Sequence, residues 1–374
     1  METPQEPLTE REIGILERLA DGLSDQEIAD ALYLSLNTIK WHNRQIYSKL
    51  GVRNRIQAIA QARLLGLVDT ETAPSPPPFQ AQREPRSPHR PNPDQRVYFT
   101  RGFDGTQIAF GVAGDGPPLV KVANYMSHLE HDWNSPVWRH WLEELTRAHT
   151  LIHADERGCG LSDWDAADLS FEAWVRDLEA VVDAVGVRRF PLFAMSQACA
   201  VAVAYAARHP ERVSRMALHG GYARGWLKRN LSPEQIEEEN LMIGLMRVGW
   251  GRENPAFRQV FALQLFPEAS PDELRALETA MRLSLPPENA VRLEREMHRV
   301  DVADAAQHVL APTLILHSHG DEAVPFQEGR LLASLIPNAQ FVPLESKNHL
   351  VTRHEPAWAK LTEALRRFLA VEVK

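Results

Sequence analysis

A proline-rich stretch near residue 80 divides this chain more firmly than any other feature of its sequence. Residues 72–96 read TAPSPPPFQAQREPRSPHRPNPDQR and hold eight of the 26 prolines. Proline has no N–H to donate to a helix or a strand ladder, and no apolar periodicity surrounds these prolines. The stretch is therefore predicted to be an extended spacer without a core of its own. We divide the 374 residues into a domain at 1–70, a linker at 71–96 and a domain at 97–374.

Net charge and cysteine content limit the classes of partner that we expect and the cellular compartment in which we expect the protein. The formal net charge of −9 argues against a protein that binds nucleic acid over its whole surface, but it allows one small basic face. The two cysteines cannot build a disulfide framework, which favours the reducing cytosol. No charged segment followed by an apolar one opens the chain, and its apolar runs are too short to span a bilayer. We expect a cytoplasmic protein that does not act at a membrane.

Four short helices are predicted ahead of the linker from capping residues and apolar periodicity. They cover residues 10–21, 25–32, 36–50 and about 55–65. The first three begin after a side chain that can cap a helix, namely Thr9, Ser24 and Ser35. In the second helix, Glu27 stands where it would complete a capping box with Ser24. This half of the chain is therefore expected to be an all-α bundle.

The third helix carries the informative surface. At 100° per residue its outward stripe consists of Asn37, Lys40, Trp41, Arg44 and Ser48. The opposite side is apolar apart from His42, for which we favour a role in the core. Residues 35–68 hold six basic side chains and no acidic one, whereas residues 1–34 hold nine acidic ones. A basic helix face suits the major groove of double-stranded DNA, although solvated basic faces are also common on helical bundles.

The order of residues in this half resembles the LuxR-type helix-turn-helix family over its full length. The resemblance rests on LTEREIGIL at 8–16, GLSDQEIA at 22–29 and SLNTIKWHNRQIYSKLGVRNRIQAIA at 35–60. It implies that the third helix is the recognition helix and that the fourth mediates dimerisation, so double-stranded DNA and a second copy of the chain are the expected partners. The candidate DNA-binding residues are the outward stripe together with Thr38 and Lys49. Members usually carry this module at the C-terminus, so its place here is a departure.

After the linker, short β-branched runs alternate with helical stretches, as in a doubly wound α/β domain. Strands are predicted at about 97–100, 107–113, 118–123, 149–154, 190–194, 213–218, 313–318 and 339–344. Helices are predicted at 136–146, 171–185, 197–208, 325–336 and 356–370. Residues 222–300 interrupt this plan with helical patterns rich in Leu, Met, Trp and Phe, which is typical of a cap over a pocket. The sequence therefore predicts an α/β-hydrolase fold with a helical cap at about 222–300.

Candidate catalytic residues follow three of the predicted strands. Ser196 lies between a strand and a small-residue helix, with alanine two positions away on either side, which matches a nucleophile elbow. Asp321 and His349 follow the last two strands, and the order Ser, Asp, His is that of α/β-hydrolases. In such a triad His349 would take the proton of Ser196, and Asp321 would orient the imidazole. The usual elbow glycines are alanines here, which makes the turn tighter.

The region from about 97 to 369 resembles the α/β-hydrolase family, and DERGCGLSD at 155–163 resembles the family's loop after the fourth strand. The oxyanion donors are expected to be the backbone N–H groups of Gln197 and of Tyr125 or Met126. The loop that usually opens with His-Gly reads Ala-Asn-Tyr-Met at 123–126, which departs from the family's pattern. No metal and no cofactor is expected, and both cysteines are interpreted as packing residues. Candidate pocket residues are Asn124, Tyr125, Met195, Trp226, Trp250 and Phe261. For most of the candidates within the cap, a role in the cap core is the simpler interpretation.

These patterns support two principal hypotheses. The first is a transcription regulator whose hydrolase-like domain senses a small, largely apolar ligand under the cap, with hydrolysis reduced or dispensable. The second is an active serine esterase or related hydrolase that carries a DNA-targeting module and acts on an ester substrate. A combination, in which slow turnover ends the signal, is also consistent with the sequence. The intact triad favours at least residual catalysis, whereas the altered elbow and Asn124 favour sensing.

Overall fold

The structure is a computed structural model of the whole chain, and it divides into two compact units at Met1–Pro74 and Ser75–Lys374. It describes residues 8–20, 23, 25–32, 34, 36–52, 55–65, 67 and 95–370. Residues 71–94 of the predicted linker, and the predicted caps Ser24 and Ser35, lie outside the described residues. The same holds for a few side chains within the first four helices, including that of Asn37. Each unit is considered by itself below.

The N-terminal unit contains the four predicted helices within its described residues. They are α1 (Glu10–Ala20), α2 (Asp25–Leu32), α3 (Leu36–Leu50) and α4 (Arg55–Leu64). A capping box starts α1, because Thr9 Oγ1 accepts from the Glu12 N–H at 3.3 Å and Glu12 Oε2 accepts from the Thr9 N–H at 2.8 Å. Each helix contributes apolar side chains to one core made of Ile15, Leu16, Leu19, Ile28, Ala29, Ile39, Ile46, Leu50, Ala58 and Ala62.

The C-terminal unit is built on one eight-stranded sheet within residues 95–370, in the order β1-β2-β4-β3-β5-β6-β7-β8. The strands are β1 (Arg96–Arg101), β2 (Gln107–Ala113), β3 (Pro118–Lys121), β4 (Thr150–Ala154), β5 (Phe190–Met195), β6 (Val213–His219), β7 (Thr313–Ser318) and β8 (Ala339–Leu344). β1 pairs antiparallel with β2, β2 pairs antiparallel with β4, and β3 to β8 run parallel to one another. The central strands are buried on both faces, which explains their continuous apolar runs.

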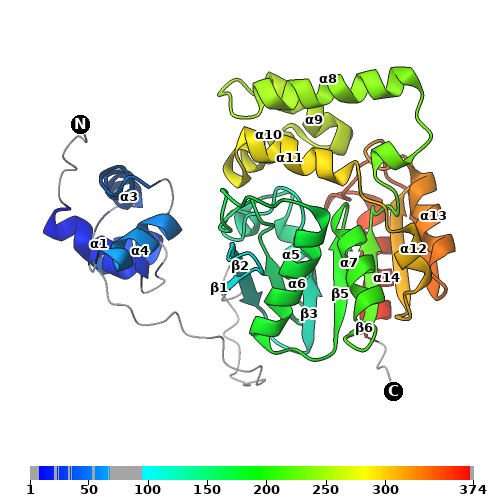
Figure 1. Cartoon of the computed structure of the whole chain (residues 1–374), viewed down its shortest axis with the longest axis horizontal. Coiled ribbons are helices and arrows are strands. Elements are labelled where there is room, and N and C mark those ends of the chain that lie inside the picture. The colour runs from blue at the N-terminus through cyan, green and yellow to red at the C-terminus, as the bar shows by residue number, and fades with distance from the viewer. Residues whose placement is uncertain are drawn as a thin grey trace. The chain divides into compact units, whose positions relative to one another are not determined.

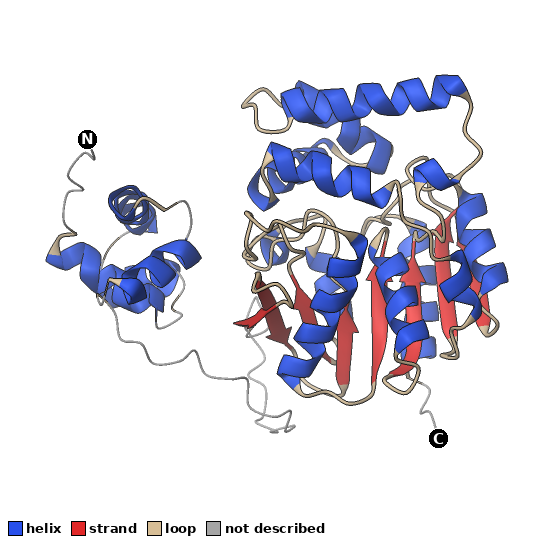
Figure 2. Ribbon diagram, in the orientation of Figure 1, coloured by secondary structure: helices blue, strands red, loops and turns tan. Residues whose placement is uncertain are grey.

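Helices cover both faces of this sheet (Figure 2). Those that alternate with the strands are α5 (Arg139–Leu145), α6 (Phe171–Val185), α7 (Ala198–Arg208), α12 (Ala303–Gln307), α13 (Phe326–Leu335) and α14 (Pro356–Leu369). Trp141 of α5 and Trp358 of α14 meet edge to face at 4.8 Å between ring centroids, so these two helices pack together. The helices α6 and α7 contact each other, as do α7 and α12, and α12 and α13. The predicted α/β architecture is confirmed.

The cap stands between β6 and β7 in the sequence and lies over the carboxyl ends of the strands (Figure 1). Its helices are η2 (Trp226–Lys228), α8 (Pro233–Gly249), α9 (Ala256–Leu265), α10 (Pro271–Ser284) and α11 (Pro287–Met297), and a further short helix, η1 (Asp132–Asn134), follows β3. Capping boxes at Ser232 and Ser270, each followed by proline, begin α8 and α10. Because parallel strands end at one edge, the cap faces the loops that carry the candidate catalytic residues. Within the described residues, no helix is long and apolar enough to cross a membrane.

Candidate active site and DNA-binding surface

The loop between β5 and α7 holds Ser196 in a strained backbone conformation. Its φ is +53°, which residues other than glycine rarely adopt, and its N–H donates to the carbonyl of His219 on β6 at 2.9 Å. The alanines at 194 and 198 are fully buried. A sharp turn with small neighbours projects the hydroxyl beyond the end of the sheet, as the sequence predicts for a nucleophile elbow.

Asp321 and His349 meet at the ends of β7 and β8. His349 Nδ1 lies 2.7 Å from Asp321 Oδ2, and Asp321 Oδ1 accepts from the N–H groups of Ala323 and Val324 at 3.0 and 2.9 Å. Burial works to raise the pKa of Asp321, but the paired His349 outweighs it and holds this pKa below its usual range. Asp321 is therefore an ionised acceptor that fixes the orientation of the imidazole.

The other ring nitrogen of His349, Nε2, is buried and has no hydrogen-bond partner among the described residues. Ser196 and His349 line the same cavity, but no hydrogen bond joins their side chains in this structure. Contacts between a nucleophile and its base are often loose without substrate and tighten in the complex. The structure thus brings Asp321 and His349 into contact and places Ser196 beside them at the cavity.

The loop carrying His349 is also joined to the cap. The His349 N–H donates to the carbonyl of Leu265, the last residue of α9, at 2.8 Å. The neighbouring Asn348 accepts at Oδ1 from the N–H of Glu268 at 2.9 Å. Two hydrogen bonds therefore tie the segment of the imidazole to the end of one cap helix.

The two candidate halves of the oxyanion site both line this cavity. Gln197 directly precedes α7, and Tyr125 and Met126 follow β3. Met126 has a φ of +63°, so it adopts the left-handed conformation that glycine would take more easily. Asn124 is buried, hydrogen bonds to the Lys121 ammonium and donates through Nδ2 to the Tyr125 carbonyl at 3.0 Å. Asn124 thereby holds the loop in a shape that a glycine-rich loop reaches without such support.

The cavity under the cap has a volume of roughly 1180 Å³, part of which is open to solvent. Among the predicted pocket residues, its walls include Asn124, Tyr125, Met195, Trp226 and Phe261. Trp250 is not among the lining residues. Its ring is buried in the cap beside Phe261 at 5.7 Å, and its N–H donates to the Met281 carbonyl at 3.0 Å. Trp250 therefore belongs to the cap core.

Part of the cavity wall consists of ionisable side chains, Glu239, Glu294 and His298. His298 Nε2 lies 3.2 Å from carboxylate oxygens of Glu239 on α8 and of Glu294 on α11. Burial opposes a proton on His298, but the two carboxylates outweigh it and raise its pKa. Within the described residues, these three form the one group of acidic and histidine side chains close enough to share a metal ion. Their mutual ion pairs already account for the arrangement.

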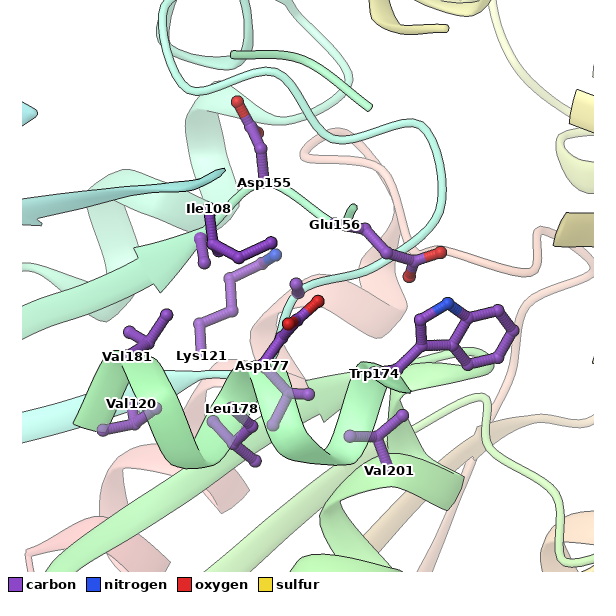
Figure 3. Close-up of a pocket in the computed structure, with 13 residues that line it drawn as sticks. Ile108, Val120, Lys121, Asp155, Glu156, Trp174, Asp177, Leu178, Val181 and Val201 are labelled. Atoms are coloured by element: carbon purple, nitrogen blue, oxygen red, sulfur yellow. The ribbon is translucent and has the colours of Figure 1, made fainter. Parts of the chain in front are cut away.

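A buried polar cluster, which the predicted site residues do not include, lines the pocket drawn in Figure 3. It contains Lys121, Asp155 and Glu156, all at most 5% exposed. Burial raises the pKa of Glu156 to about 8 and lowers that of Lys121. Asp155 and Glu156 open the loop after β4 that resembles a family motif, which was the one available signal for them.

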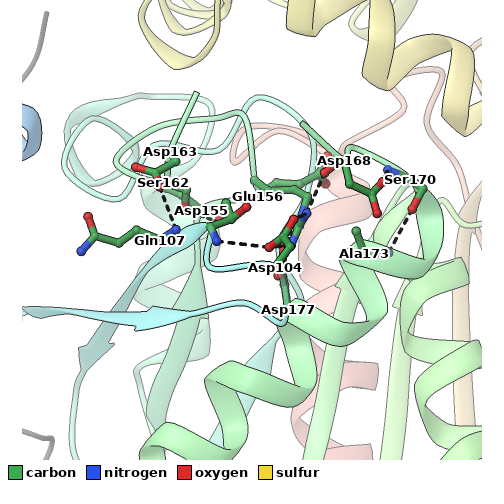
Figure 4. Close-up of polar contacts among 12 residues, drawn as sticks. Asp104, Gln107, Asp155, Glu156, Ser162, Asp163, Asp168, Ser170, Ala173 and Asp177 are labelled. Atoms are coloured by element: carbon green, nitrogen blue, oxygen red, sulfur yellow. Dashed lines mark hydrogen bonds and ion pairs between the residues drawn. The ribbon is translucent and has the colours of Figure 1, made fainter. Parts of the chain in front are cut away.

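Arg157 anchors this same loop from within, and its partners Asp104, Asp168 and Asp177 are labelled in Figure 4. Its guanidinium donates to Asp177 of α6 at 2.6 Å and to Asp104 at 2.9 Å, and its side chain is fully buried. It also donates to the carbonyl of Asp168 at 2.6 Å. Burial works to raise the pKa of Asp104, but the guanidinium outweighs it and lowers this pKa to about 2. Planar guanidinium contacts of this kind fix position as well as charge, so the loop over 155–163 is rigidly placed.

In the N-terminal unit, the outward stripe of α3 is exposed as predicted for Lys40, Trp41, Arg44 and Ser48, with the Trp41 side chain 54% exposed. The side chain of Asn37 lies outside the described residues, and Thr38 is half-buried. Lys49 instead forms an ion pair with the buried Glu12 at 2.9 Å. Its ammonium is therefore engaged within the domain.

His42 is half-buried and touches Trp41 edge to face at 4.9 Å. Among the described side chains of α3, the buried polar one is that of Asn43, which donates to Asp25 Oδ1 of α2 at 2.9 Å. Asn43 thus makes the inward polar contact that the helical pattern had suggested for its neighbour.

Comparison with protein families supports the two domains. Residues 6–62 match the family described as bacterial regulatory proteins, luxR family, and residues 129–292 match the alpha/beta hydrolase fold. The chain joins a LuxR-type helix-turn-helix domain to an α/β-hydrolase domain. The helix α3 lies within the LuxR-type match, and Ser196 lies within the hydrolase match.

Individual relatives of both kinds are known. The α/β-hydrolase domain is 25% identical over 258 residues to a pyrrolizixenacetamide deacetylase of Xenorhabdus hominickii, across 67% of this chain and 90% of that protein. The LuxR-type domain is 39% identical over 64 residues to the transcriptional regulator AlkS of Alcanivorax borkumensis, across 17% of this chain and only 7% of AlkS.

Solved structures similar to the α/β-hydrolase domain include a thermophilic esterase from Thermogutta terrifontis, at 26% identity and a TM-score of 0.59. That match covers 73% of this chain and 98% of the esterase. A bromoperoxidase from Bacillus anthracis is 18% identical with a TM-score of 0.62, over 74% of this chain and all of that one, and at this identity it supports the fold alone.

Proposed function

We propose that this protein is a transcription regulator that binds double-stranded DNA and senses a small ligand in its α/β-hydrolase domain. The observations that carry the proposal are the exposed basic side chains of α3 in the LuxR-type domain and the cavity beneath the cap in the hydrolase domain of the same chain. A concave cavity lined by apolar side chains with a few polar groups is the usual form of a small-molecule site. Binding to chromosomal DNA requires access to the bacterial cytoplasm, which is where we place the protein.

On the DNA side, Lys40, Arg44 and Ser48 would contact the duplex from α3, and Trp41 would add apolar contact area. Arginine pairs with guanine through two hydrogen bonds in the major groove, whereas lysine and serine more often bind phosphate. We propose a homodimer, with α4 as the dimerisation helix of the LuxR-type family. Such a dimer would recognise two half-sites about one helical turn apart, roughly 10 base pairs.

On the ligand side, the cavity walls suit a small, largely apolar molecule with one polar end. Met195, Met246, Phe261 and Leu265 supply apolar surface. Glu294 Oε2 is buried without a hydrogen-bond partner among the described residues. A hydrogen-bond donor on the ligand would pair with this oxygen and remove an unfavourable unpaired acceptor.

A second candidate function is ester hydrolysis, and the contact between Asp321 and His349 favours it. Ser196 Oγ would attack the carbonyl carbon of the ester while His349 Nε2 takes the hydroxyl proton. The negative oxygen of the tetrahedral intermediate would accept from the Gln197 N–H and from that of Tyr125 or Met126. His349 would then pass its proton to the departing alcohol, and water would release the acid from Ser196 by the reverse sequence.

The decisive experiment compares DNA binding with and without an occupant of the cavity. Duplexes selected by the full-length protein from a random pool serve as the operator, and octyl trifluoromethyl ketone serves as the occupant. The ketone can add reversibly to Ser196 in the wild type, while the Ser196→Ala variant can only bind it.

If sensing is the function, the ketone changes the DNA affinity of the wild type, and Ser196→Ala retains a response to bound ketone. If turnover alone is the function, the protein hydrolyses p-nitrophenyl butyrate while its DNA affinity ignores the ketone at saturation. This second result would reject the regulator proposal in favour of the hydrolase.

A further inference from the structure

Glu156 contacts both halves of the candidate oxyanion site, one through its side chain and the other through its backbone. Its carboxylate oxygen Oε2 accepts from Gln197 Nε2 at 2.7 Å, and its N–H donates to Ser127 Oγ at 3.0 Å. We propose that Glu156 is a positioning residue that fixes the two oxyanion donors at the spacing that the tetrahedral intermediate requires. The proposal rests on the hydrolytic step described above.

The first contact is the hydrogen bond between Glu156 and Gln197, and it restrains the nucleophile elbow at Ser196. Gln197 occupies the N-cap position of α7, yet its side chain makes no capping bond there. It turns instead to Glu156, and both residues are almost fully buried, at 2% and 4% exposure. A buried hydrogen bond between two long side chains restrains the backbone that carries each of them. The Gln197 N–H, the expected first donor, is thereby held in place.

The second link acts on the loop after β3. Ser127 directly follows Met126, whose φ of +63° marks a conformation that must be held by its surroundings. The hydroxyl of Ser127 accepts from the Glu156 N–H, and Ser284 of the cap donates to the Met126 carbonyl at 3.0 Å. The expected second donor, from Tyr125 or Met126, is therefore positioned partly by Glu156.

Glu156 can position the two donors because its neighbours in the sequence, Asp155 and Arg157, are themselves held by hydrogen bonds and ion pairs. Asp155 Oδ2 accepts from the N–H groups of Leu129 and Leu161 at 3.1 and 2.8 Å. On the other side, Arg157 is held by Asp104 and Asp177. Figure 4 shows Asp104, Asp155, Glu156 and Asp177 gathered around the loop. Misplacement of a catalytic group by about 1 Å can lower a rate on the order of 100-fold, so such anchoring matters.

The protonation state of the Glu156 carboxyl is consistent with its proposed role in positioning the oxyanion donors. The carboxyl of Glu156 is turned away from the Lys121 ammonium in Figure 3. Burial raises the pKa of Glu156 to about 8, so the carboxyl is mostly neutral at pH 7 and does not repel a nearby oxyanion. The titratable groups that face it electrostatically are Lys121, Tyr125, Arg157, Cys159, Asp177 and Tyr222.

The test compares Glu156→Leu, which removes the link to Gln197, with Glu156→Gln, which can still accept from Gln197 Nε2. The readouts are kcat and KM for p-nitrophenyl butyrate, and the rate at which an alkyl fluorophosphonate labels Ser196. We expect Glu156→Leu to lower kcat and labelling about 10- to 100-fold, with KM changed less than about threefold. Glu156→Gln should stay within about threefold of wild type at pH 7 and lose the decline in labelling that the wild type shows above about pH 8.

The control is Glu12→Leu, which removes an equally buried carboxyl from the other domain and should leave the ester rate unchanged. A reactive wild type with an equally reactive Glu156→Leu variant would overturn this inference alone. Equal damage by Glu156→Gln and Glu156→Leu, with both melting temperatures lowered, would also overturn it, because only packing would then be involved. A wild type inert to both probes would reject the hydrolytic step and this inference with it.

Discussion

The two domains present their polar side chains in opposite ways. On α3 the residues proposed to meet DNA come from successive turns of one helix, and Lys40, Trp41, Arg44 and Ser48 are exposed. In the hydrolase domain Asp321 and His349 are buried, come from segments 28 residues apart, and are joined by a hydrogen bond. An exposed helix face is thus a set of nearly independent contacts, whereas the buried site acts as one unit.

The largest expected difference between the domains comes from Ser196→Ala. If the serine is the nucleophile, its removal should lower ester turnover by several powers of ten, because no other group can form the acyl-enzyme. DNA affinity without ligand should be unchanged, since the change lies in the other domain. Hydrolysis of p-nitrophenyl butyrate and DNA titration of the same preparation measure the two effects. Undiminished hydrolysis in this variant would remove Ser196 from the mechanism.

On the DNA side, Arg44→Ala should weaken binding to the selected operator by about 1–3 kcal/mol if Arg44 pairs with a guanine. Binding to a duplex with that base pair replaced should be weakened much less, because the contact is already lost there. Fluorescence anisotropy with both duplexes measures the difference, and ester turnover should not change. Equal weakening on the two duplexes would reassign Arg44 to a phosphate contact.

Lys40 and Lys49 test whether exposure on α3 predicts a DNA contact. Lys40→Ala should reduce the slope of log affinity against log salt by about 1, because an exposed lysine at the groove releases a counterion. Lys49→Ala should leave that slope nearly unchanged and destabilise the domain by about 1–3 kcal/mol, because the buried Glu12 loses its partner. Thermal unfolding measures the loss of stability, and DNA titrations at several salt concentrations measure the slope. A salt slope reduced equally in both variants would show that Lys49 also reaches the DNA.

The smallest expected effect concerns pH and the stability of the hydrolase domain. Folding raises the pKa of Glu156 from its ordinary value of 4.5 to about 8, so between these values the folded state keeps a proton that the unfolded state has released. The free energy of unfolding of the wild type should therefore fall as pH rises across this window. Relative to Glu156→Gln, the fall should be about 1 kcal/mol per pH unit. Parallel urea titrations at pH 6, 7 and 8 would measure it, and identical slopes would contradict a raised pKa.

Local patterns in the sequence predicted most of the fold. The bounds of α3, β7 and β8 agree with the expected ranges, because helical periodicity and short apolar runs mark these segments in the sequence. The partners Asp321 and His349 could be predicted because parallel strands end at one edge. The linker at 71–96 and the roles of the triad residues stay predictions.

Contacts between distant segments could not be predicted in the same way. Nothing in the spacing of Lys49 and Glu12 indicates an ion pair, because it depends on how α1 packs against α3. Trp250 and Phe261 share a composition typical of a cap, but only the packing of α8 and α9 decides which of them lines the cavity. The link between Glu156 and Gln197 likewise spans 41 residues and two loops.

The two hydrogen bonds that join the segment of His349 to the end of α9 have a mechanical consequence. Because the His349 N–H is bound to the Leu265 carbonyl, a displacement of α9 either carries the imidazole with it or breaks that bond. A displacement of the cap would therefore also affect His349, the proposed general base. A ligand that holds the cap away from the sheet would displace the imidazole of His349 without contacting it. A ligand that brings the cap closer would align the imidazole with Ser196.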